Sequence, residues 1–176
     1  SGLLSREDIG PRGKRIDIQV ADRRSDIALV DAVFSTSNFV GARAILRNEE
    51  MDSVLVTQCH PANIGFSSLA GTIEMITPDD DYGMFLDLNW NKHDYICAIS
   101  AGVMLKFGVD EKKMLKVGES ITQKPDYDGT VAVDGEREVP FRAGDDVTLT
   151  LTRNGPRKVD VRKAVELGAK RGMFKV

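Results

Sequence analysis

The sequence lacks several features that mark specialised classes of protein. It contains 2 cysteines and 2 histidines in 176 residues, so a disulfide-stapled secreted fold is not indicated and there is little material for a zinc site. Its longest apolar run, residues 98–105, is interrupted by Ser100 and Gly102 and is far shorter than the roughly 20 residues that span a bilayer. The N-terminus has no basic start and no apolar core, which predicts no signal peptide.

An excess of positive charge is also missing. The 24 Lys and Arg residues stand against 27 Asp and Glu residues, which gives a formal net charge of −3 at pH 7, so neither nucleic acid nor an acidic membrane is expected as a partner. The apolar fraction of 41% and the charged fraction of 29% are typical of one globular domain with a real core. Two cysteines without a leader favour reduced thiols and a cytoplasmic protein.

The common catalytic motifs are absent as well. The chain has no phosphate loop, no G-x-G-x-x-G, no G-x-S-x-G, no HExxH and no CxxC. The acidic run of residues 79–81 could suggest a cation site, but the calcium-loop spacing is missing and a solvated turn is favoured. Cys59 and His60 are adjacent and would point to opposite faces of a strand. The sequence therefore predicts no metal site.

Short apolar segments at regular spacing predict a mainly β fold, in particular a β-sandwich with one or two short helices. Residues 1–14 are expected to be a polar lead or an interdomain segment, and residues 15–176 to form a single β-rich domain. Asp134-Gly135 suits a two-residue hairpin turn, and residues 109–117 fit either a short helix or an exposed strand. The expected strands cover residues 15–20, 27–34, 53–56, 83–89, 130–133, 136–141, 147–151 and 158–161. Residues 95–107 are further apolar strand material, broken by Gly102.

A helix is expected at the C-terminus. Asp160 could cap it, and the basic residues Lys170 and Arg171 suit its negative end. Its inner face would be formed by the small and apolar residues Ala164, Val165, Leu167 and Gly168.

The stretch at residues 56–71 is the main candidate for a binding site. An apolar strand there meets Pro61 and then a small-residue helix start, which Asn63 could cap. Backbone N–H groups near Asn63 to Phe66 and the helix dipole would favour a phosphate, and Gly65 would let it approach. The alternative is a purely structural corner.

Two charged residues in other segments could take part. Asp31 lies among strand apolars, where it could bond a ligand hydroxyl or simply face outward. Arg43 could face a phosphate or pair with an acid.

Three stretches in this order carry a resemblance to a known family: IALVDAVF (residues 27–34), HPANIGFSSLAG (residues 60–71) and VAVDGEREVPFRAGDDVTL (residues 131–149). Together they resemble the C-terminal domain of ATP-NAD kinase-like proteins, in particular the AcoX-like, predicted polyphosphate/ATP-NAD kinase branch. FVGARAI and DVRKAVELGAKRGMF are also similar to that branch. The resemblance runs from about Gly10 to Phe174.

The resemblance implies a β-rich domain that packs against an N-terminal α/β domain carrying a GGDGT motif. This sequence lacks that motif, and its residues 128–130 repeat only the last three letters. The resemblance therefore implies an excised nucleotide-binding domain of a phosphotransferase, inactive alone. ATP or polyphosphate, NAD and Mg²⁺ would serve the full-length protein.

The family's motifs can be carried onto this chain residue by residue. Its Asn-acid pair falls at Val30 and Asp31, so only the acid is kept. Its Thr-Pro-Thr-Gly-Ser-Thr-Ala-Tyr turn falls at residues 60–67, where Pro61, Gly65 and Ser67 are kept. The candidate binding residues are Asp31, Arg43, His60, Asn63, Gly65 and Ser67.

Other functions remain open. Related lipid kinases carry a similar Asp-Gly-Glu hairpin, which keeps a diacylglycerol or lipid kinase-like domain as an alternative. A non-catalytic ligand-sensing module or an oligomerising module is also compatible with the sequence, because strand edges often associate. We expect a homo-oligomer.

Overall fold

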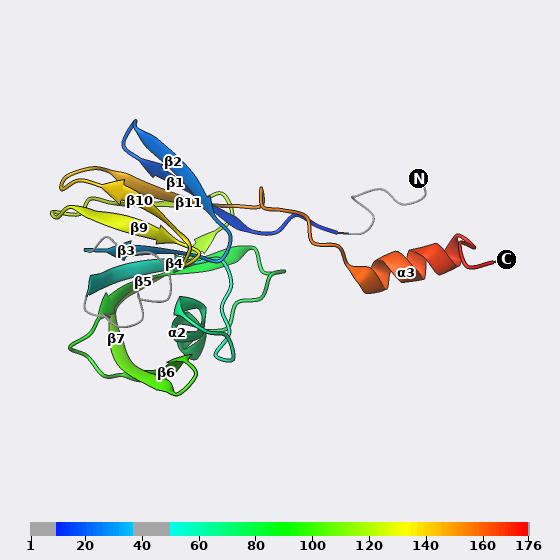
Figure 1. Cartoon of the computed structure of the whole chain (residues 1–176), viewed down its shortest axis with the longest axis horizontal. Coiled ribbons are helices and arrows are strands. Elements are labelled where there is room, and N and C mark those ends of the chain that lie inside the picture. Colours follow the sequence, from blue (N-terminus) through cyan, green and yellow to red (C-terminus); the bar gives the residue numbers. More distant parts are fainter. Residues whose placement is uncertain (1–9, 37–49, 176) are drawn as a thin grey trace.

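The computed structural model describes residues 10–36 and 50–175. Its elements confirm the mainly β prediction (Figure 1). They are β1 (Arg15–Val20), β2 (Arg24–Ala28), β3 (Asp31–Ser35), β4 (Met51–Val56), α2 (Phe66–Ile73), β5 (Tyr82–Asn89), β6 (Tyr95–Ser100), β7 (Val103–Lys116), β8 (Ser120–Gln123), β9 (Gly129–Val133), β10 (Arg137–Phe141), β11 (Val147–Thr152) and α3 (Val161–Lys170).

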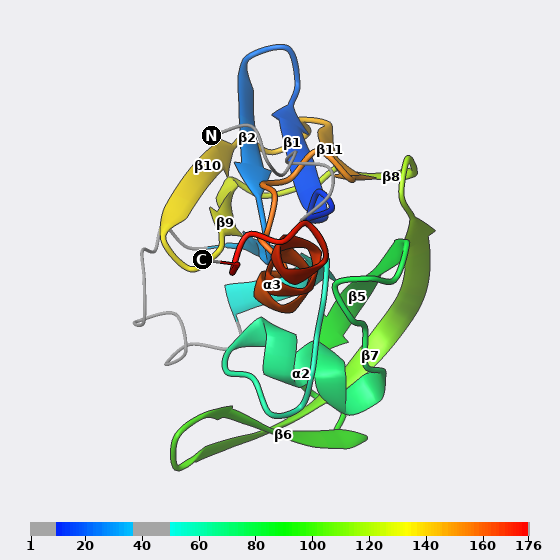
Figure 2. The same ribbon diagram turned by 90° about the vertical axis from the view of Figure 1, so that its right-hand side faces the viewer.

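The strands form two antiparallel sheets. The smaller has the order β2-β1-β11-β8, and the larger has the order β10-β9-β3-β4-β5-β7-β6. The sheets stack as a sandwich, and α2 lies on the other face of the larger sheet beside β6 (Figures 1 and 2).

Side-chain alternation accounts for this layering. In β1 the buried residues Ile16, Ile18 and Val20 face the larger sheet and join one apolar cluster with Phe34 and Phe85. A second cluster lies under α2 and includes residues from β4, β5, β6 and α2 itself. Strands β4 and β5 are buried on both faces, which explains their nearly continuous apolar runs.

The prediction of one strand over residues 27–34 is wrong. The chain leaves the smaller sheet at the end of β2, turns at Leu29 and Val30, and enters the larger sheet as β3. The turn is stabilised because the Asp134 carboxylate accepts hydrogen bonds from the backbone N–H groups of Leu29, Val30 and Asp31. A long-range contact of this kind leaves no periodic signal in the sequence.

The predicted hairpin is confirmed as β9 and β10. Asp134 and Gly135 have the expected left-handed torsions, with φ values of 51° and 67°. The prediction of a two-residue turn is wrong, because Val133 pairs with Arg137 and three residues connect the strands. Residues 109–117 belong largely to the long strand β7 rather than to a helix. Residues 158–160 are not a strand but an extended connection to α3.

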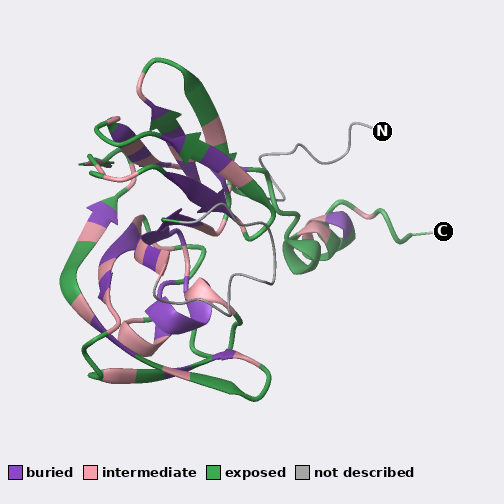
Figure 3. Ribbon diagram, turned by 60° about the vertical axis from the view of Figure 1, so that its left-hand side comes forward, coloured by how far each residue is buried: buried purple, intermediate pink, exposed green. Residues whose placement is uncertain are grey.

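The C-terminal helix begins as predicted, with the Asp160 carboxylate accepting from the Lys163 N–H at 2.9 Å. The expectation that its apolar face turns inward is wrong. Val165 is 52% exposed, and of the helix residues only Gly168 is buried. Figure 3 shows α3 largely exposed beyond the sandwich.

Candidate functional site

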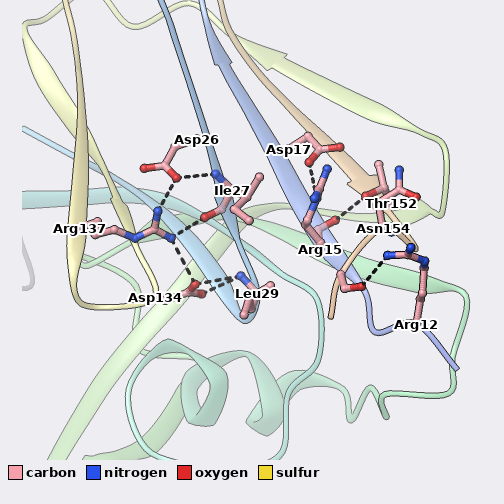
Figure 4. A network of polar contacts seen from close by, with 11 residues as sticks. Arg12, Arg15, Asp17, Asp26, Ile27, Leu29, Asp134, Arg137, Thr152 and Asn154 are labelled. Carbon is pink, nitrogen blue, oxygen red and sulfur yellow. Dashed lines mark hydrogen bonds and ion pairs between the residues drawn. The ribbon is translucent and has the colours of Figure 1, made fainter. Parts of the chain in front are cut away.

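The turn between β2 and β3 is the point where the first and third resembling stretches meet. Asp134, from the hairpin, accepts from the Leu29 N–H at 2.9 Å (Figure 4). It also accepts from the Val30 N–H at 2.8 Å and from the Asp31 N–H at 3.2 Å. The Arg137 guanidinium lies 4.0 Å from the same carboxylate and donates to the Ile27 carbonyl at 2.7 Å. The hairpin thus fixes the turn from one side.

Thr57 fixes the turn from the other side. Its N–H donates to the Val30 carbonyl at 2.9 Å, and its hydroxyl donates to the Leu29 carbonyl at 2.8 Å. Thr57 follows directly on β4, so the loop that leads to α2 begins against this turn. Thr57 therefore ties the first resembling stretch to the start of the loop that leads to the second.

Asp31 is the most unusual group at this point. It is the first residue of β3, opposite Val56 of β4, and Val33, two residues on, faces the cluster under α2. Alternation therefore places Asp31 on the face of the sheet that carries α2. Burial, and then the nearby Asp134 carboxylate, raise the pKa of Asp31 to about 7 because both disfavour the charged form.

The loop of residues 60–67 is closed mainly by its own hydrogen bonds. His60 Nδ1 accepts from the Ala62 N–H at 3.0 Å, and the Asn63 amide donates to the Ser67 hydroxyl at 2.7 Å. Ser67 is buried, whereas His60 and Asn63 are exposed. Most of the polar groups in this loop therefore hold its shape.

The expectation that Asn63 caps the helix is wrong. The N-cap residue of α2 is Gly65, with φ 68°, and no side chain caps the helix. The Gly65 N–H donates to the Ile99 carbonyl at 2.8 Å, and a Cβ at Gly65 would meet nothing within 4 Å. The Gly65 N–H, one of the groups expected to bind a phosphate, is therefore already bonded within the protein, although open space remains in front of Gly65.

A cleft of about 620 Å³ opens beside the Leu29–Val30 turn. Its walls are the N-terminal segment 11–14, Thr57 and Gln58, the turn at Pro78 and Asp79, and the connection to α3. The cleft is lined by four basic residues and only two acidic ones, Asp79 and Asp160. The basic residues are Arg12, Lys14, Arg153 and Lys158.

Lys14 is the buried cation of this cleft. It is 6% exposed, and its ammonium donates to the carbonyls of Thr77 and Tyr82 at 2.9 and 2.8 Å. Burial, and then the Arg153 guanidinium, lower the pKa of Lys14 to about 8. These two hydrogen bonds use two of the three N–H donors of the ammonium.

The acidic run is a solvated turn, as predicted. The Asp80 carboxylate accepts from the Thr77 N–H and hydroxyl, and Arg153 binds the Asp81 carboxylate and three carbonyls of the turn. Within residues 10–36 and 50–175, no group of three or more His, Cys, Asp or Glu could hold a metal ion.

The candidate residues of the sequence do not all come together. Asp31 lies at the meeting point, Gly65 and Ser67 lie further along the loop, and Arg43 falls outside the described residues. Sequence reasoning missed Lys14 and treated Asp134 only as a turn residue. A lone lysine before a strand and an Asp-Gly turn are too common to signal these roles.

Three comparisons place the chain among known proteins. The family model of the acetoin catabolism protein X C-terminal domain matches residues 14–154. The acetoin catabolism protein X of Cupriavidus necator is 36% identical over 157 residues, which are 84% of this chain and 43% of the relative. The chain belongs to the acetoin catabolism protein X C-terminal domain family.

The fold comparison agrees with this assignment. The crystal structure of yeast NADH kinase complexed with NADH matches with a TM-score of 0.51 and 12% identity, covering 94% of this chain and 49% of that one. At that identity the likeness shows the fold alone, which is that of the NAD kinase C-terminal domain. The resemblance drawn from the sequence is confirmed.

The match covers only part of the relative's length. The chain spans less than half of the length of its curated relative. In the part of the chain that the structure describes, no helix is long and apolar enough to cross a membrane.

Proposed function

We propose that this chain is the nucleotide-binding half of a kinase-like phosphotransferase and that it does not transfer phosphate alone. The observation that carries the proposal is the cleft of about 620 Å³ beside the Leu29–Val30 turn. Its volume is in the range of small-molecule and cofactor sites, and its basic lining favours an anionic ligand.

In this proposal the ligand occupies the cleft and extends beyond its lining residues. Lys14 offers its remaining N–H to a phosphate oxygen at one wall. Asp31, next to the lining residue Val30, offers its carboxyl to a ribose hydroxyl. The backbone in front of Gly65 leaves room for a second part of the ligand.

The partner in this proposal is a preceding α/β domain, to which residues 1–14 connect. That domain would bring the donor phosphates and Mg²⁺, because the described residues hold no cluster for the metal. NAD is proposed as the nucleotide that this half binds. The structural neighbour, a NADH kinase complexed with NADH, supports that choice.

Calorimetric titration of the chain with NAD, NADP and ATP tests the proposal. We expect at least one nucleotide to bind and Asp31→Ala to weaken it about tenfold, the size expected for a lost hydrogen bond to a charged or strongly polar group. Asp22→Ala is the matched control, since Asp22 is exposed in the turn between β1 and β2. Equal binding by the Asp31→Ala chain removes Asp31 from the site, and no binding by any of the three nucleotides refutes the proposal.

A further inference from the structure

The C-terminal helix α3 exposes an apolar face that nothing in the described structure covers. Val161 is 69% exposed and Val165 is 52% exposed. Phe174, just past the helix, is 65% exposed. No helix or strand among the described residues packs closely against α3, and Figures 1 and 2 show it at the end of an extended connection.

This helix is nevertheless well defined by its own sequence. Asp160 caps its first turn. At its C-terminal end the Met173 N–H donates to the Gly168 carbonyl at 3.0 Å, and the Gly172 N–H donates to the Ala169 carbonyl at 3.0 Å. Gly172 has φ 71°, so the helix ends in a Schellman motif. Helices of about ten residues are marginally stable alone in water. Capping at both ends therefore stabilises α3 although no other element packs against it.

The path of the chain indicates where that surface lies. Residues 10–14 and 154–158 run side by side as a neck. The Gly13 N–H donates to the Pro156 carbonyl at 2.9 Å, and the Gly155 N–H donates to the Gly13 carbonyl at 3.0 Å. A Cβ on Gly155 would lie 2.7 Å from two backbone oxygens, so the two segments approach as closely as glycine allows.

The neck makes both ends of the described chain leave the sandwich together. Figure 1 shows the N-terminal connection and the connection to α3 leaving on the same side. The helix therefore lies on the side of the sandwich at which the chain enters at Gly10. The curated relative has more than half of its length outside the match, and the matching family model is that of a C-terminal domain.

We propose that the apolar face of α3 docks on the part of the full-length protein that precedes residue 1, so that this C-terminal helix clamps the two halves around the cleft. The inference rests on the proposed function only in assuming that a preceding domain exists. The cleft reaches the start of α3, since Val159, Asp160 and Val161 line it. Docking of α3 would thus close one wall of the site.

Hydrogen exchange measured by mass spectrometry, without any nucleotide, tests the docking. The 176-residue chain is compared with the full-length protein encoded by its gene. We expect the amides of α3 to exchange at least tenfold more slowly in the full-length protein. The amides of β11 should exchange alike in both and serve as the internal control.

A pair of variants in the full-length protein sharpens the test. Val165→Lys should abolish the extra protection of α3, whereas Arg162→Lys, which places the same side chain on the polar face and keeps a cation opposite Glu166, should leave it. Equal exchange of α3 in the two proteins overturns the proposal, as does a gene product that begins near Ser1. Protection that appears in the 176-residue chain only at high concentration assigns the face to a second copy and also overturns it. If α3 is protected but nucleotides do not bind, only the proposed function fails.

Discussion

Asp31→Asn is expected to stabilise the protein, and the gain should depend on pH. In the folded protein the pKa of Asp31 is about 7, against an ordinary value of 3.8. Between these two values the folded chain keeps a proton that the unfolded chain loses. The folded state therefore binds more protons, and its stability falls as the pH rises from about 4 to about 7.

The size of the effect follows from the shift. A change of about three pKa units at 1.36 kcal/mol each gives an upper limit of about 4 kcal/mol. Asparagine keeps the shape of the side chain and does not titrate, so the variant escapes this cost. The free energy of unfolding of the variant should exceed that of the wild type only slightly at pH 4 and by about 2–4 kcal/mol at pH 8. Between these values the difference should grow by about 1.4 kcal/mol per pH unit.

Urea denaturation at half-unit steps from pH 4 to pH 8 measures the difference. Asp22→Asn, in an exposed turn, is the control and should give a constant difference. A difference between Asp31→Asn and wild type that does not change with pH would show that Asp31 is not held neutral by burial and by Asp134.

Two further changes test the contacts that hold the turn. Asp134→Ala should lower the free energy of unfolding by about 3 kcal/mol, because three backbone N–H groups lose their acceptor. Glu136→Ala, in the same turn, is the control and should have little effect. A loss below about 0.5 kcal/mol for Asp134→Ala would contradict the role given to Asp134. Thr57→Val, which removes the hydroxyl bond to the Leu29 carbonyl, should cost about 1 kcal/mol in urea denaturation. Thr122→Val, at an exposed site on β8, is its control, and equal losses would remove the special role of Thr57.

Local patterns in the sequence predicted much of the fold. Alternation marked β1 and β11, and Asp134-Gly135 marked the hairpin, because each depends on neighbours along the chain. The run of residues 27–34 misled because its break depends on Asp134, more than 100 residues away. The sequence pattern of residues 161–170 correctly indicated an amphipathic helix, but it could not show that the sandwich leaves the apolar face of this helix uncovered.

The candidate site was only partly predictable for the same reason. Asp31 could be found because a carboxylate among strand apolars is rare. Lys14 could not, since its burial depends on the carbonyls of Thr77 and Tyr82, which approach it only in the folded chain. The cleft is likewise built from segments at both ends of the chain, and no single stretch contains it.

The claim that this domain binds a nucleotide in the cleft is tested most directly by recording backbone amide shifts by NMR while NAD is added. We expect the largest changes at Val30, Thr57 and Gln58, and none at the tip of the β6–β7 hairpin. Changes confined to another face of the sandwich, or no saturable change with NAD, NADP or ATP, would contradict the claim.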